Sequence, residues 1–419
     1  MEKVLNIILQ YSDTKEERKQ LKNYLDKIDE QLTNFIGQLD LVMKQLPITK
    51  YSLGYMYLLA AKASLKRFQN PELILMQIQT FLLQCDPSQV SMSIEKFFFL
   101  CRRFVTIAIR EKFAHGTIYP LKIAIEKIGR SGELTPTHAY FLQACLASQN
   151  FSAALPILES DVFEIDTKHT KIKIKDVLLY FYYGGMIYTG LKKYDEATYY
   201  FELAVTIPAD TLSSIMLESY RRYLLTSILS TGKAPLIPQN TSMSIQGMLR
   251  KVCKPYEEFV EAFKSMDIER VGICISTYME VYEKDKTFGL IKLVRDNLVR
   301  RKIQRLTKTY ITLSLEYVSQ QLNMNSTQEA EFYLLDMIEQ GEVFATIDQK
   351  EGQISFHADP EPYDSVRVSL ELNEKIQEVI GLAKNLDLLD EKISTNSNFI
   401  HKMVIKELQG GGNKTEEND

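Results

Sequence analysis

Histidine is the residue type in this chain best suited to metal or acid-base chemistry, and its five copies are scattered. They are His115, His138, His169, His357 and His401. None belongs to a His-x-His or His-Glu-x-x-His motif, and none has a carboxylate at the spacing of zinc ligands. We therefore expect neither a catalytic centre nor a bound metal. A metal site that only folding assembles is the alternative that the sequence leaves open.

The glycines form no phosphate-binding or nucleophile motif. Gly232-Lys233 lacks the upstream glycine and the following Ser or Thr of a phosphate loop, and no helix is predicted after Gly410 to Gly412 to receive an anion. The Gly-x-Ser-x-Gly turn that holds a nucleophilic serine is also missing. We expect no cofactor, and we do not expect an enzyme.

The five cysteines are odd in number and far apart, so they suit neither a disulfide framework nor a zinc ribbon. They are Cys85, Cys101, Cys145, Cys253 and Cys274. This spacing predicts a reducing compartment. The first ten residues lack the basic region and cleavage site of a signal peptide. The apolar stretch from Phe97 to Ile109 is interrupted by Arg102 and Arg103, short of the ~18 residues of a membrane helix.

The length and charge of the chain limit the architectures that it can adopt. A chain of 419 residues exceeds the usual size of one core, which predicts two or three units or an elongated array. With 45% hydrophobic and 25% charged residues, the composition is that of an ordinary globular protein. The net charge of -4 indicates neither a nucleic-acid binder nor an acidic scaffold.

Residues 1–300 read as an irregular array of helix pairs. The clearest unit follows the tetratricopeptide pattern, in which small residues let two helices approach and large residues fill the space between turns. The matching positions are Phe181, Gly184, Gly185, Tyr188, Ala197, Phe201 and Pro208. A weaker copy has Phe151 and Ala154, separated from the first by a loop at 161–175. The expected fold is mainly α, beginning with a TPR-like helical solenoid.

Residues 301–358 follow the element order of a winged helix: helix, short strand, helix, helix and hairpin. The stretch from Thr309 to Thr312 suits the short strand. Ser326 and Glu329 form the pattern of a capping box ahead of the last helix, and Gly341 ends it. We predict a winged-helix module with a small β-sheet here.

The hairpin and the helix before it predict a protein partner. Its strands are expected at 343–347 and 354–356, with Gly352 able to take positive φ between them. No Lys or Arg occurs from 326 to 349, so this helix and hairpin would repel a phosphate backbone. The acidic residues there are Glu329, Glu331, Asp336, Glu339, Glu342 and Asp348.

The helix that leads into the winged helix is basic. Its cations are Lys292, Arg295, Arg300, Arg301, Lys302, Arg305 and Lys308. Such a run binds an acidic partner or RNA in some proteins, and is a solvated face with local ion pairs in others. The sequence leaves both open.

The C-terminal part is expected to contain a joint at 359–369, bundle helices at 370–408 and a disordered tail at 409–419. A long helix is predicted from Leu370 to Ile393, and a short one from Phe399 to Leu408. The long helix carries a seam with steps of four and three, namely Leu372, Ile376, Val379, Ala383 and Leu386. The seam packs either on its own chain or on another subunit.

Several stretches together resemble a known family. They are Tyr194 to Ala197, Ile215 to Tyr220, Gln304 to Leu315, Glu329 to Glu331, Met337 to Glu339, Gly341 to Lys350, Gly352, and Ile354 to His357. With the order of array and winged helix, they resemble the PCI-domain family of the proteasome lid, the COP-nine signalosome and translation initiation factor three. The third-subunit family of the signalosome is the most similar. The likeness covers about residues 179–360, and before Pro120 only the helical rhythm is recognised.

The resemblance implies a non-catalytic scaffold in a cytoplasmic and nuclear complex that removes a ubiquitin-like modifier from cullins. Partners would be other PCI subunits and metalloprotease-fold subunits, one of which holds the catalytic metal, and cullin-based ubiquitin ligases through the complex. In that family, winged helices line up edge to edge and C-terminal helices form one bundle. The implied winged-helix interface is Val343, Phe344, Ala345, Ile347, Ile354 and Phe356, and the implied helical interface is the seam from Leu372 to Leu386.

Two alternatives remain at this stage. One is a related subunit of the proteasome lid, which would differ in its partners. The other is a PCI protein that binds RNA in mRNA export or translation. The acidic helix and hairpin disfavour direct nucleic-acid binding.

Overall fold

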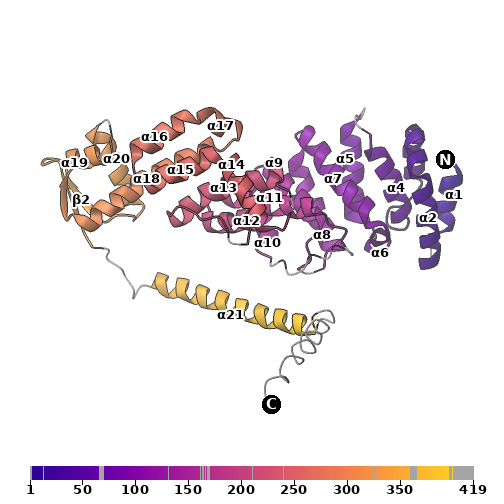
Figure 1. The fold of residues 1–419 in the computed structure, drawn as a ribbon. Helices are drawn as coiled ribbons and strands as arrows, with labels where there is room; N and C mark the ends of the chain where they lie inside the picture. Colours follow the sequence, from indigo (N-terminus) through magenta and orange to yellow (C-terminus); the bar gives the residue numbers. More distant parts are fainter. Residues whose placement is uncertain are drawn as a thin grey trace, which may run out of the picture. The chain divides into compact units, whose positions relative to one another are not determined.

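The computed structural model describes residues 2–12, 14–65, 70–130, 132–160, 162, 165, 167, 170–209, 211–238, 240–324, 326–358, 366–395 and 399. Two compact units are present: Met1–Thr309 with Leu315–Leu334, and Tyr310–Ser314 with Leu335–Asp419. Helices dominate the described residues, and three short strands near their C-terminal end form a small antiparallel sheet, which confirms the predicted fold class (Figure 1). None of the helices in the described ranges is long and apolar enough to cross a membrane.

The array occupies most of the first unit. Its helices are α1 (Glu2–Gln10), α2 (Lys15–Leu32), α3 (Ile36–Lys44), α4 (Ser52–Ala63), α5 (Pro71–Gln84), α6 (Pro87–Val90), α7 (Ile94–Arg110), α8 (Ile118–Ile128), α9 (Pro136–Ala147), α10 (Leu155–Leu158), α11 (Ile174–Gly190), α12 (Tyr194–Thr206), α13 (Ser214–Thr231), α14 (Met243–Val252), α15 (Lys254–Lys264), α16 (Ile268–Thr277) and α17 (Met279–Lys284). Four short 3-10 helices lie at Thr33–Phe35, Ser91–Ser93, Ala114–Thr117 and Ser152–Ala154. Pro136 begins α9, because its fixed φ suits a first helical turn.

The tetratricopeptide-like unit is the pair α11 and α12, and small residues bring its helices together as predicted. A Cβ atom on Gly184 would lie 2.5 Å from Cδ1 of Tyr200, and one on Gly185 would lie 2.7 Å from Cε1 of Phe201. Ala197 and Phe201 are fully buried. Much of the loop predicted at 161–175 lies outside the described residues.

A polar network joins α13 to the region of α15 and α17. Arg221 Nη1 lies 2.6 Å from Glu218 Oε1 and 2.9 Å from Asp285 Oδ1. The hydroxyl of Tyr256 donates to Asp285 Oδ2 at 3.0 Å, and the Arg221 guanidinium lies over the Tyr256 ring. These charges are shielded and mutually paired, so they fix the register of α13 against its neighbours.

The winged-helix elements appear in the predicted order. They are α18 (Phe288–Thr309), β1 (Thr312–Ser314), α19 (Leu315–Gln321), α20 (Thr327–Glu339), β2 (Ala345–Asp348) and β3 (Gln353–Phe356). The first strand begins at Thr312 instead of Thr309, because α18 continues through Thr309. α18 also runs without a break through the domain border predicted between residues 300 and 301. The domain limits predicted from the sequence therefore remain predictions.

The second unit contains the sheet and the long C-terminal helix α21 (Val366–Ser394), which begins at Val366 instead of Leu370. The strand order is β1-β3-β2, and both pairings are antiparallel. Gly352 and Gly341 take φ of +64° and +71°, as the hairpin loop and the helix end require. Of the joint predicted at 359–369, residues 366–369 belong to α21 and residues 359–365 lie outside the described residues. The tail and the short helix predicted from Phe399 to Leu408, apart from Phe399, also lie outside them.

Candidate partner-binding surfaces

Strand β2 is one of the two edge strands of the sheet, and its hydrogen-bonding pattern identifies the backbone groups that point away from β3. The N–H of His357 donates to the carbonyl of Phe344 at 2.7 Å, so these two residues are a hydrogen-bonded pair. In an antiparallel ladder such pairs alternate with non-hydrogen-bonded ones. The backbone N–H and C=O groups of Thr346 therefore form hydrogen bonds with Ser355 of β3. Those of Ala345 and Ile347 point away from β3.

The position of β3 corrects one expectation from the sequence. We expected both hairpin strands to offer an exposed edge, but β3 lies between β1 and β2. The side chains of Ile354 and Phe356 are buried, and their strand already has a neighbour on each side. Val343 is buried as well, and its N–H donates to the Met337 carbonyl. These three residues stabilise the module from its interior.

The β2 edge is short and lightly protected. Phe344, Ala345 and Ile347 are half-buried along it, while Thr346 and Asp348 face solvent. Natural edge strands often carry Lys or Pro to prevent pairing with another chain, and β2 has neither. Its geometry therefore permits strand addition by a partner.

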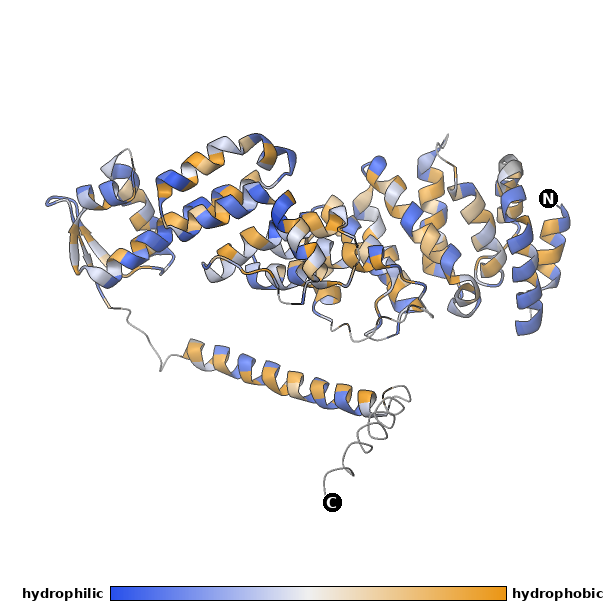
Figure 2. Ribbon diagram, viewed as in Figure 1, coloured by the Kyte–Doolittle hydropathy of each residue, from blue (hydrophilic) through white to orange (hydrophobic). Residues whose placement is uncertain are grey.

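Helix α21 exposes the seam predicted from the sequence. Leu372, Ile376, Val379 and Leu386 are 60%, 47%, 64% and 57% exposed, and Ala383 is exposed too. Figure 2 shows hydrophobic residues recurring along the whole helix. In a helix of an ordinary solvated surface, these positions would be polar.

Helix α21 carries further apolar residues that the predicted seam did not include. They are Val366, Leu370, Ile380, Leu382, Leu388 and Ile393, all exposed. At about 100° per residue, Ile380 and Leu382 widen the seam on its two sides, whereas Leu370 and Leu388 lie on the opposite face. Apolar residues on several faces are typical of a helix enclosed by other helices. A simple count of apolar positions around the whole helix, instead of a search for one stripe, would have found them.

Helix α20 carries the acidic surface expected from the sequence. The Ser326 hydroxyl accepts a hydrogen bond from the Glu329 N–H at 3.2 Å, which begins the helix as a cap. Phe332 is 70% exposed on it, beside acidic residues and without any Lys or Arg. A winged helix that reads DNA presents cations at this place. α20 therefore lacks the charge for a phosphate backbone.

Part of the basic helix α18 has a structural role. Lys302 Nζ donates to the Gln321 carbonyl at 3.0 Å, and Arg301 Nε donates to Asn297 Oδ1 at 2.7 Å. The Arg301 guanidinium also lies against Gly232, where the helix α13 ends in a left-handed residue. A cation at that end of a helix interacts favourably with its dipole. Arg301 is thus one cation of the run with an intramolecular partner.

No cluster suited to a metal ion occurs among the residues that the structure describes. Thr135 donates its N–H to His138 Nδ1 at 3.1 Å, and burial lowers the pKa of His138 to about 4. His357 contacts the Thr346 hydroxyl at 3.0 Å, and His169 and His401 lie outside the described residues. Burial raises the pKa of Cys145 to about 12 and that of Cys253 to about 11, so neither thiol is activated as a nucleophile.

Comparisons with known proteins agree with this architecture. Residues 15–245 match the family described as "COP9 signalosome complex subunit 3, N-terminal helical repeats", and residues 276–358 match the PCI domain. The chain is 34% identical over 389 residues to COP9 signalosome complex subunit 3 of Dictyostelium discoideum, with 92% of each chain covered. It is 35% identical over 384 residues to the subunit of the same name from Drosophila melanogaster, covering 87% of this chain and 86% of the relative. The chain therefore belongs to the PCI-domain family of COP9 signalosome complex subunit 3.

Proposed function

We propose that this chain is a non-catalytic scaffold subunit of the COP9 signalosome. The observation that carries the proposal is α21, a helix of 29 residues whose apolar side chains are exposed on several faces. Burying one such Leu or Ile contributes about 1.5–3 kcal/mol, so a bundle of partner helices would gain much from enclosing it. The relatives are named as subunits of that complex.

The partners in this proposal are other PCI subunits and metalloprotease-fold subunits. They would contact the seam from Leu372 to Leu386 and the β2 edge, where the backbone N–H and C=O groups of Ala345 and Ile347 point away from β3. Cullin-based ubiquitin ligases would be reached through the complex, in cytoplasm and nucleus, and another subunit would remove their ubiquitin-like modifier. This chain would hold that subunit in place, consistent with the absence of a metal-ligand motif in its sequence.

The β2 edge allows a sharp test, because proline can remove one outward donor without breaking the sheet. Ala345→Pro and Ile347→Pro each delete an N–H that β3 does not use. Thr346→Pro deletes a donor that pairs with Ser355 and should unfold the sheet. We expect the first two variants to keep the thermal stability of the isolated chain but to lose co-purification with co-expressed companion subunits. Normal assembly of both variants would contradict a role for this edge.

A PCI protein that binds RNA is the second candidate, favoured only by the exposed cations of α18. Arg295, Arg305 and Lys308 are exposed. Binding of the full-length chain to single-stranded RNA and duplex DNA should be measured at ~50 mM salt, where electrostatic binders associate tightly. The scaffold proposal predicts weak binding to both. Tight, salt-sensitive binding that is lost on Arg305→Gln would favour the second candidate.

A further inference from the structure

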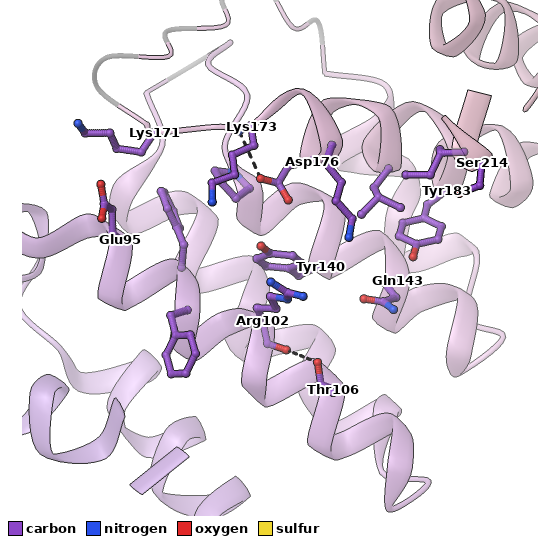
Figure 3. Close-up of a pocket in the computed structure, with 16 residues that line it drawn as sticks. Glu95, Arg102, Thr106, Tyr140, Gln143, Lys171, Lys173, Asp176, Tyr183 and Ser214 are labelled. Carbon is purple, nitrogen blue, oxygen red and sulfur yellow. Dashed lines mark hydrogen bonds between the residues drawn. The ribbon is translucent and has the colours of Figure 1, made fainter. Parts of the chain in front are cut away.

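A cavity of about 770 Å³ lies within the helical array, apart from the two surfaces already described. It is bordered by α7, α9, the segment before α11, α11 itself and the start of α13. Figure 3 shows Tyr140 at its centre, with Lys173 and Asp176 on one side and Arg102 and Gln143 on the other. A volume of this size is within the range of ligand sites.

Four cations line this cavity and only two carboxylates oppose them. The cations are Arg102, Lys171, Lys173 and Lys175, and the carboxylates are Glu95 and Asp176. All four cations are exposed, and within the described part of the chain none of them forms an ion pair. The Asp176 carboxylate already has a backbone partner, because its Oδ2 accepts a hydrogen bond from the Lys173 N–H at 3.3 Å at the start of α11. The cavity therefore has an excess of positive charge.

The rest of the lining adds a tyrosine hydroxyl and an apolar wall. Burial, with the neighbouring Asp176 carboxylate, raises the pKa of the Tyr140 hydroxyl, whose proton is directed toward that carboxylate. Phe99, Leu179, Tyr183 and Ile215 line the cavity as half-buried apolar side chains. A matching ligand needs an anionic group of high charge and an apolar group next to it.

We propose that this cavity binds a phosphorylated segment of a partner protein, with the phosphate among Arg102, Lys171, Lys173 and Lys175 and an adjacent apolar side chain against Tyr183. A phosphoserine or phosphothreonine carries up to two charges and three acceptor oxygens, so it can contact several of these cations at once. A single carboxylate has one charge and two oxygens. The site does not depend on the scaffold proposal, since it uses neither α21 nor β2.

The first test uses inorganic pyrophosphate as the probe and the full-length chain. Lysine acetylation by a small reagent, followed residue by residue with mass spectrometry, reports which ammonium groups the anion protects. We expect several-fold slower labelling of Lys171, Lys173 and Lys175 at saturating pyrophosphate. Lys122 and Lys251, exposed elsewhere in the array, should label at an unchanged rate. Equal protection of all five lysines would overturn the proposal, because it would show only general ionic screening.

The second test distinguishes phosphate from other anions. A fluorescent peptide with phosphoserine beside phenylalanine should bind at least about tenfold more tightly than its unphosphorylated form. Lys173→Gln with Lys175→Gln should remove this difference, and Lys122→Gln should not. Equal binding of a peptide with Glu in place of phosphoserine would overturn the phosphate assignment in favour of an acidic segment. Tighter binding of single-stranded RNA through the same lysines would overturn the protein partner.

Discussion

Helices α12 and α21 are both rich in apolar residues but hold them in opposite environments. In α12, Ala197, Phe201, Ala204 and Val205 are fully buried against neighbouring helices of the array. In α21 the apolar positions are exposed. The array therefore buries its own apolar residues, whereas the proposed scaffold function requires partner subunits to bury those of α21. Substitutions in the two regions should fail in different ways, and each prediction below tests that difference.

The largest loss of stability is expected from Phe201→Ala in the array. Phe201 is fully buried and lies against Gly185, so its removal leaves a cavity that two closely packed helices cannot fill. We expect a loss of about 3–5 kcal/mol in the free energy of unfolding, measured with urea. Tyr199→Ala on the same helix, at a site 59% exposed, is the control and should cost less than about 0.5 kcal/mol.

Acidification should destabilise the array through His138. Burial lowers the pKa of this imidazole from 6.5 to about 4, so the folded state favours the neutral form. The neutral imidazole makes its full contribution to the free energy of unfolding above pH 6.5. This contribution, about 3 kcal/mol, is lost as the pH falls toward 4. His138→Gln keeps an acceptor for the Thr135 N–H but does not titrate. The measurement is the difference in unfolding free energy between wild type and this variant from pH 7 to pH 4, and a constant difference would contradict the prediction.

A smaller loss is expected where α13 ends. Gly232 has φ of +66°, and a Cβ there would lie 1.5 Å from Cζ of Arg301. Gly232→Ala should cost about 1–2 kcal/mol, of which about 1 is backbone strain. Combining it with Arg301→Ala should cost less than the sum of the two single changes, because the clash is then gone. Additive effects in urea unfolding would show that Arg301 simply moves away.

The smallest effect on stability is expected in α21, together with the largest effect on assembly. Ile376→Asp or Val379→Asp should leave the helicity and melting temperature of the isolated chain unchanged, because these side chains are exposed. The same variants should abolish co-purification with companion subunits, since a buried unpaired charge is costly in a bundle. Asn373→Asp adds the same charge outside the seam and should assemble normally. Equal loss of helicity and assembly would mean that α21 packs on its own chain.

The sequence predicted element order well because its signals are local. Pro136 at the start of α9, Ser326 before α20 and Gly352 in the hairpin loop each act within a turn of the chain. Helix periodicity likewise gave the seam of α21. The predicted start of β1, Thr309, was wrong by three residues. The stretch Thr-Tyr-Ile-Thr suits a strand, but α18 continues through Thr309 and overrides that preference.

What the sequence could not provide is the arrangement of distant segments. Nothing local distinguishes a central strand from an edge strand when both are short and β-prone, so Ile354 and Phe356 were expected at an edge. The cavity likewise combines Arg102 from α7, Tyr140 from α9 and lysines just before and at the start of α11, separated by tens of residues. Their individual patterns are those of ordinary helices and loops, and only folding brings the charges together.

The central place of β3 has a consequence for synthesis of the chain. Translation produces β1 about forty residues before Gln353, and β2 has no pairing partner other than β3. Neither earlier strand can be paired until Phe356 has left the ribosome. A message truncated just after Asp348 would therefore release a polypeptide that has the helices before β2, lacks α21 and carries two unmatched strands, a form that quality-control chaperones would recognise.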